Sequence, residues 1–416
     1  MAADDDLDEL DELDECIGPT NKRKARWTHQ RIIWSEHVEQ LQHENMFCTE
    51  YCMSYQAFMK LRNLLYSELK RDERKSRSQE VVSVETVIGT GLRYLAGGLP
   101  RDIRHIFGLS RAEAYNCISK FVAAVNSNNS LDINMPSTAD EWETVRKGFA
   151  SRASEPIMAG CVGAIDGYFQ TTNSPYRREV GNVLAYYSGH YEDYGVNCQA
   201  ACDATLRFLY FGVVAPGRTN DNAAFPLCKG LLEAIANLPP GVFFVGDAAY
   251  TLEEHLLVPF TGAEKLDANK DAFNFYLSQM RIRIEMAFGR LVQKFGILKK
   301  NLVGELASSS KIITACSRLH NYVIEEDKPF EIVRGGIPMD DEIVPMMGAP
   351  SGMCYKPVIP EEEDIVDMEL GQSEIRKALV ESITAQHLRR PMYNLIRNNR
   401  VEANDTNVAL EYYHPP

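Results

Sequence analysis

Three carboxylates stand in apolar stretches of the sequence, where an unpaired charge is costly. Asp166 and Asp247 each follow a run of small and apolar residues, and Glu285 stands between two apolar neighbours. A glycine within four residues of each acid keeps the side-chain bulk around it low. Carboxylate oxygens suit Mg²⁺ or Mn²⁺, and two such ions about 3.5–4 Å apart can hold the attacking and leaving oxygens of a displacement at phosphorus. These acids are therefore candidates for a two-metal site acting on a phosphodiester.

Each acid also has a structural explanation. An Asp at the end of a strand usually completes a turn or caps a helix, and Glu285 can pair with Arg281 four residues earlier. Asp221 is a fourth candidate, but Asn220-Asp221 before an apolar helix is also an ordinary N-cap. Asp203 stands in an expected hairpin turn, and we interpret it as structural. Residue type and spacing leave both explanations open.

The elements around these acids predict an α/β domain with a mixed sheet. Two of the expected strands end at Asp166-Gly167 and Gly246-Asp247, and Glu285 falls inside a long helix. The expected strands are 157–165, 196–202, 207–214 and 241–245, and the expected helices are 223–227, 273–298 and 309–323.

The region before this domain, about 34–125, has helical periodicity. A helix over 84–96 stops at Gly97-Gly98, Pro100 opens a second helix, and a Ser110/Glu113 capping box after a tight turn opens a third. This order is that of a helix-turn-helix, although a plain three-helix bundle has the same pattern. The candidate DNA-contacting residues in it are Arg101, Arg104, Arg111 and Lys120.

Charge is distributed unevenly along the 416 residues, whose formal net charge is −14. Residues 4–15 hold nine carboxylates and residues 361–369 hold six, and without these fifteen the chain is near neutral. Between 277 and 300, six basic residues accompany one acid, as binding of a phosphate backbone would require. Candidate DNA contacts there are Arg281, Arg283, Arg290 and Lys294. A nucleic-acid partner is therefore compatible with the acidic total.

Composition excludes several classes of protein. No apolar run reaches the roughly 18 residues of a membrane span, and the first 15 residues have no apolar signal core. Ten scattered cysteines without a Cys-x-x-Cys pair predict reduced thiols and argue against a zinc finger. The basic cluster 22–26 is either a nuclear import signal or a solvated charge run.

Six segments, in order, resemble the DDE domain of PIF/Harbinger transposases and of the nucleases derived from them. The resemblance covers roughly 157–323 and, more weakly, the helix-turn-helix before it. The segments are CVGAIDG at 161–167, VNCQAACDA at 196–204, APGRTNDN at 215–222, FVGDAAY at 244–250, IEMAFGRL at 284–291 and SRLHNY at 317–322. The chain differs from many relatives in having Tyr168-Phe169 in place of Thr-His, and Ser188-Gly189-His190 in place of a segment with Lys.

The resemblance implies an RNase H-like fold, with a five-stranded mixed sheet flanked by helices. It also implies Mg²⁺- or Mn²⁺-dependent cutting of DNA at transposon ends, followed by strand transfer, by an enzyme that is formally a hydrolase. By the same resemblance, Asp166, Asp247 and Glu285 are the catalytic metal ligands, and Asp221 is an additional metal ligand. Relatives depend on a Myb-like accessory protein for end recognition and nuclear entry, so DNA, such a protein and a nuclear location are expected. The sequence leaves open whether the protein forms a homo-oligomer.

The expected organisation has four parts: an acidic then basic disordered tail (1–30), the helical region (31–130), the nuclease domain (150–325), and an acidic linker with a final amphipathic helix (326–416). The main alternative is a domesticated, non-catalytic DNA-binding or chromatin-associated protein. A metal phosphohydrolase of small molecules is disfavoured, because a small substrate needs neither the basic helix nor the upstream helical region.

Overall fold

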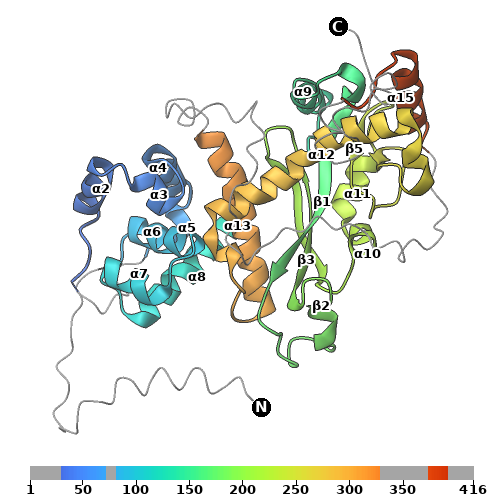
Figure 1. Ribbon diagram of the computed structural model, residues 1–416. Helices are drawn as coiled ribbons and strands as arrows, with labels where there is room; N and C mark the ends of the chain where they lie inside the picture. The colour runs from blue at the N-terminus through green and yellow to red at the C-terminus, as the bar shows by residue number, and fades with distance from the viewer. Residues whose placement is uncertain (1–29, 72–80, 328–372, 392–416) are drawn as a thin grey trace, which may run out of the picture.

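The computed structural model describes residues 30–71, 81–327 and 373–391 (Figure 1). The two acidic runs and the basic cluster 22–26 lie outside these described residues. No helix within the described ranges is long and apolar enough to cross a membrane. None of the eight cysteines in these ranges forms a disulfide with another described residue.

The first part of the chain is helical, as predicted. Ser110 accepts a hydrogen bond from the Glu113 backbone N–H at the start of the third predicted helix, although the Glu113 side chain pairs with Arg71. Gly108 ends the helix before it in a left-handed conformation (φ 61°), which glycine adopts without strain. The helices are α2 (Trp34–His43), α3 (Phe47–Tyr51), α4 (Tyr55–Leu64), α5 (Tyr66–Leu69), α6 (Val84–Leu95), α7 (Pro100–Phe107), α8 (Arg111–Ser127) and α9 (Ala139–Ala150).

A mixed sheet follows, and it confirms the expected fold class of an RNase H-like domain after a helical region. Its five main strands run in the order β4-β3-β1-β5-β6, and a sixth, two-residue strand, β2, pairs with the start of β3. β1, β3 and β4 are antiparallel neighbours, whereas β5 and β6 run parallel to β1. The strands are β1 (Cys161–Thr171), β2 (Tyr187–Ser188), β3 (Asp193–Cys202), β4 (Phe208–Pro216), β5 (Phe243–Val245) and β6 (Leu256–Leu257).

The predicted bounds of the first strand are wrong at both ends. Pro156–Met158 forms a 3₁₀ helix, and β1 begins only at Cys161. The strand then passes through Asp166-Gly167 to Thr171, because its pairing with β3 continues over eight residues. Asp166 therefore lies inside a paired strand, where its backbone is fixed on both sides, and not at a strand end.

Helices cover the sheet and join it to the first part of the chain. Figure 1 shows α13 between the sheet and the N-terminal helices, and α13 packs on both α8 and β4. Tyr322 of α13 donates a 2.6 Å hydrogen bond to the Ala57 carbonyl of α4, and one hydrophobic core runs through both parts. The remaining helices are α10 (Asp221–Ala224), α11 (Lys229–Ala236), α12 (Ala268–Lys294), α13 (Leu306–Glu326) and α15 (Glu374–Ala385).

Candidate active site

Asp166 is the most deeply buried of the candidate acids. Its side chain projects from β1, where only 5% of the residue is exposed, and its Oδ1 accepts the backbone N–H of Gly167 at 2.9 Å. Burial raises the pKa of the Asp166 carboxyl to about 8, and the negative charges of Asp247 and Asp221 add to this shift while Arg281 opposes it. An apolar strand therefore carries an acid whose ionised form needs positive charge nearby.

Asp247 and Glu285 reach the same region from two other elements. Asp247 follows β5, the parallel neighbour of β1, and its Oδ1 accepts the Ala249 N–H at 2.9 Å. Burial raises the pKa of Asp247, and Asp221 and Glu285 raise it further. Glu285 lies on α12, which packs across β1. The fold thus brings together three acids that are distant in the sequence.

Arg281 contacts two of these three acids. Its Nη2 lies 2.6 Å from Glu285 Oε1, and its Nη1 lies 3.6 Å from Asp166 Oδ2. Its charge also opposes the rise in the pKa of Asp247. The pairing of Arg281 with Glu285 anticipated from the sequence is therefore present, but it is one contact of an arginine that faces several acids.

Asp221 lies at the first position of α10, and its neighbour Asn220 is the N-cap, accepting the Ala223 N–H at 2.9 Å. The cap function that the sequence left open for Asn220-Asp221 therefore belongs to Asn220. The Asp221 carboxylate occupies the space beside Gly167: a Cβ on that glycine would lie 2.0 Å from Asp221 Oδ1. The glycine in β1 is what allows this acid to approach the strand.

An amide network holds Asp221 in place. Its Oδ1 accepts hydrogen bonds from Asn197 Nδ2 at 2.9 Å and Gln199 Nε2 at 2.8 Å. Tyr250 in turn donates to Gln199 Oε1 at 2.7 Å. Gln199 is the β3 partner of Gly167, so these groups share the sheet face onto which Gly167 opens. Asp166, one residue earlier, points to the opposite face, toward α12.

The donor set fits a hard divalent cation, because buried carboxylates that raise one another's pKa are stabilised by added positive charge. In the described parts of the chain, however, no three His, Cys, Asp or Glu side chains stand close enough to hold one metal ion. Arg281 lies between Asp166 and Glu285, and amides hold Asp221 on the other face.

The aromatic residues that replace the usual Thr-His pair are packed in different ways. Tyr168 stacks on Phe288 of α12, with ring centroids 5.3 Å apart. Phe169 stacks on Tyr191 at 4.3 Å, with the rings nearly parallel. Partial burial raises the pKa of Tyr191 to about 12 although 45% of the residue is exposed, and the charges of Asp221 and Asp166 add to this rise, so the ring lies near the acids.

The basic residues proposed to contact DNA differ in their surroundings. In α7 and α8, Arg101, Arg111 and Lys120 are exposed, whereas Arg104 is half-buried. In α12, Arg281 pairs with acids, and Lys294 donates to the Cys52 carbonyl at 3.0 Å, joining α12 to the N-terminal helices. The remaining two, Arg283 and Arg290, are half-buried. The basic residues of α7 and α8 are therefore more accessible to DNA than those of α12.

Sequence reasoning did not single out the residues that hold Asp221. Asn197, Gln199 and Tyr250 are all buried. The signal was present, because two amides at alternate positions of an otherwise apolar strand point to one face. Their partner could not be found without the fold, since Asp221 is more than twenty residues away in the chain.

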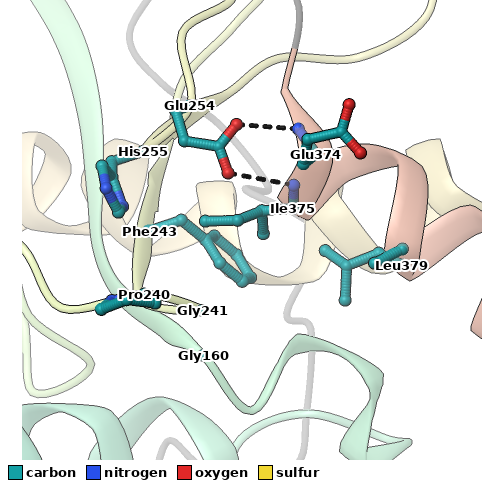
Figure 2. Close-up of a pocket in the computed structure, with 10 residues that line it drawn as sticks. Gly160, Pro240, Gly241, Phe243, Glu254, His255, Glu374, Ile375 and Leu379 are labelled. Carbon is teal, nitrogen blue, oxygen red and sulfur yellow. Dashed lines mark hydrogen bonds between the residues drawn. The ribbon is translucent and has the colours of Figure 1, made fainter.

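A pocket of about 520 Å³ lies elsewhere, between α15 and the start of β5 (Figure 2). Gly160, just before β1, and Phe243, the first residue of β5, line this pocket. Asp166 lies later in β1, and Asp247 follows the end of β5. Figure 2 shows both Glu254 oxygens accepting backbone N–H groups at the start of α15, from Glu374 at 2.7 Å and Ile375 at 3.2 Å. Glu254 thus anchors the C-terminal helix, and this pocket is separate from the acids.

Comparison with known proteins gives one match. Residues 165–321 match the family model of the DDE superfamily endonucleases, over a segment that contains all four acids and Arg281. No curated protein and no solved structure matches the chain. The family implies, in general, a DNA substrate and the use of divalent metal. Residues 165–321 are therefore similar to the domain of the DDE superfamily endonucleases.

Proposed function

We propose that this protein is a metal-dependent DNA endonuclease of the transposase type, with Asp166, Asp247 and Glu285 as its catalytic carboxylates and Asp221 as an additional metal ligand. The observation that carries the proposal is the position of Arg281, which contacts Asp166 of β1 and Glu285 of α12 within the segment that matches the DDE superfamily endonucleases. Acids that served only as turns and caps would not converge on one guanidinium.

The acids would hold Mg²⁺ or Mn²⁺, which in such a site supplies the charge that activates the attacking oxygen and stabilises the leaving one. The chain itself fixes the donors. Pairing with β3 holds the backbone of Asp166, and the Ala249 N–H orients Asp247. No protein nucleophile is required, because water attacks in hydrolysis and a DNA 3′-OH takes its place in strand transfer.

We further propose that α7 and α8 bind the DNA backbone through Arg101, Arg111 and Lys120, which are exposed. Replacing all three by Gln should weaken binding to any DNA sequence and reduce the dependence of affinity on salt concentration by about 0.9 per lost phosphate contact. Titration of labelled DNA at several salt concentrations measures both quantities. An unchanged salt dependence would show that these three residues do not contact the DNA backbone.

A Myb-like partner and a nuclear location belong to the same proposal. Pull-down with either the first 30 residues or the segment after 327 deleted tests the partner, and loss of capture with one deletion identifies its docking segment. Replacing the basic residues of 22–26 by Gln in a fluorescent fusion tests import. Unchanged nuclear accumulation of that fusion would exclude the cluster as the signal.

The decisive experiment is nicking of supercoiled plasmid in Mg²⁺ or Mn²⁺ by the wild type, Asp247→Ala and Glu285→Gln. Glu233→Gln, an exposed acid of α11, is the matched control. We expect metal-dependent nicking by the wild type and the control, and a loss of at least about a hundredfold in both active-site variants. Equal nicking by all four proteins would point to a contaminating nuclease and refute the assignment of the acids.

Binding without nicking would favour the domesticated, non-catalytic protein, for which the exposed basic face of α7–α8 would be the working part. Repeating the assay with a candidate accessory protein separates that outcome from an enzyme that needs a partner. Nicking that appears only with the partner supports the endonuclease.

A further inference from the structure

Arg281 has more acids around it than one guanidinium can neutralise. It contacts Glu285 and Asp166 directly, and its charge also acts on Asp247. When both contacting carboxylates are ionised, one guanidinium leaves an excess of one negative charge. A cation bound beside these acids would offset that excess.

The contacts of Arg281 with Glu285 and Asp166 are unequal in length, and the one with Glu285 is partly exposed to solvent. The contact with Glu285 is 2.6 Å long, whereas the contact with Asp166 is 3.6 Å long, beyond the range of a good hydrogen bond. About 25% of the Arg281 side chain and 27% of the Glu285 side chain are exposed. A long arginine side chain at this depth can turn toward solvent without opening the core.

We propose that Arg281 is an exchangeable counter-ion: it pairs with Asp166 and Glu285 when no divalent cation is bound, and cation binding releases it to contact a DNA phosphate. This inference rests on the proposed function, since it assigns Asp166 and Glu285 as ligands. The guanidinium and the cation compete for these acids, because two positive charges placed beside the same carboxylates repel each other. The released guanidinium suits a phosphate, which it binds through two parallel N–H groups.

The inference predicts opposite effects of one substitution on two ligands. Arg281→Gln removes the competitor, so Mn²⁺ should bind about 3–10-fold more tightly, because apparent affinity scales with the fraction of protein in the binding-competent state. In the presence of Mn²⁺, the same variant should bind DNA about 3–10-fold more weakly, with a salt slope lower by about one. An arginine that only stabilises the fold would not separate the two affinities in this way.

The test is calorimetric titration of the full chain with MnCl₂ alone, followed by titration of labelled DNA with Mn²⁺ present. Lys270→Gln is the matched control, because it removes one positive charge from the same helix about 16 Å away along its axis. Arg281→Lys is the second variant, because it keeps the positive charge but loses the planar guanidinium with its paired N–H donors. Its affinity for Mn²⁺ should lie between those of the wild type and Arg281→Gln. Circular dichroism melting confirms that each variant is folded.

Tighter Mn²⁺ binding by Arg281→Gln, with Lys270→Gln within twofold of the wild type, supports the inference. Unchanged or weaker Mn²⁺ binding by Arg281→Gln overturns it, and so does an equal gain in Lys270→Gln, which would reflect overall charge only. The readout does not depend on cleavage. A wild type that shows this exchange but never nicks DNA contradicts the proposed function alone, whereas one that nicks DNA while Arg281→Gln binds Mn²⁺ like the wild type contradicts this inference alone.

Discussion

Helix α12 carries two arginine–carboxylate contacts that differ in every physical respect. Near the start of α12, the Asp271 carboxylate accepts two hydrogen bonds from Arg390, at 2.7 and 2.9 Å. Each of these side chains is only 8% exposed. Further along, Arg281 faces Glu285 and Asp166 in a half-open site. The first pair is joined by two hydrogen bonds and is sealed from water, whereas in the second one arginine is shared between two acids.

This difference separates a structural ion pair from a functional one. A sealed pair with its hydrogen bonds made is strongly destabilising to break, because the remaining partner is left as a buried charge. A set of acids that shares one arginine, and of which Asp166 is buried, is destabilised when ionised and gains from an added cation. The start of α12 is therefore anchored to the C-terminal segment through Asp271 and Arg390, whereas the part around Glu285 carries acids that a cation would stabilise.

The largest effect should follow from breaking the sealed pair. Arg390→Ala leaves Asp271 buried without its guanidinium, and we expect the free energy of unfolding to fall by about 3–5 kcal/mol. Urea denaturation measures this change. Lys377→Ala on α15, whose side chain is 66% exposed, should change it by less than about 0.5 kcal/mol. If Arg281→Gln were as destabilising as Arg390→Ala, the contrast between the two sites would not hold.

Filling the space that Asp221 occupies should come next. In Gly167→Ala the new Cβ would lie 2.0 Å from Asp221 Oδ1, so the carboxylate must move. We expect a loss of about 1–3 kcal/mol in stability, typical of overpacking, together with weaker Mn²⁺ binding. Gly189→Ala is the control, since nothing lies within 4 Å of its added Cβ. Equal Mn²⁺ binding by both variants would show that Asp221 is not a ligand.

Neutralising an acid of the shared site should stabilise the protein. The pKa of folded Asp166 is raised to about 8, above the usual 3.9 of an unfolded chain. Its contribution is therefore favourable below about pH 4 and is lost as the pH rises toward and through 8. Without metal at pH 8, Asp166→Asn should be about 1–2 kcal/mol more stable than the wild type, and the gain should shrink at pH 5.

Urea denaturation in EDTA across this pH range checks the prediction. Asp271→Asn should be destabilised instead, because that carboxylate has a dedicated partner. A destabilised Asp166→Asn at pH 8 would mean that Arg281 already compensates the acid fully.

The smallest effect should come from α12 itself. Gly289 lies one turn beyond Glu285, and its added Cβ would meet no atom within 4 Å. Gly289→Ala should raise the free energy of unfolding by about 0.5–1 kcal/mol through helix propensity, without changing Mn²⁺ binding. Thermal melting with and without Mn²⁺ measures both. Altered metal binding would show that the site responds to helix stability and not only to its charges.

Much of the fold followed from local signals. The predicted α12, α13 and α15 helices are present, with bounds shifted by a few residues. Strand β1 was misplaced, since small apolar residues such as 157–160 fit either a strand or a turn, and only pairing with β3 decides where the strand runs. The α/β class was predictable because alternation of strand and helix periods needs no tertiary information.

The acids of the candidate site could be predicted from the sequence, but the residues that surround them could not. Arg281 was assigned to DNA binding because it lies in a basic run, and its position four residues before Glu285 suggested only a helical pair. Its approach to Asp166 depends on how α12 crosses β1. The amides that hold Asp221 depend in the same way on the register between β1 and β3.

The sequence by itself determined the acids, the order of elements that carry them and the sites of sharp turns, because these depend on residue type and short-range sterics. Only the tertiary structure decided which charges meet: that Arg281 contacts both Asp166 and Glu285, that Asn220 and not Asp221 caps α10, and that Asp271 pairs with Arg390 away from solvent. Electrostatic energies depend on distance and burial, and neither is written in the spacing of residues along a chain.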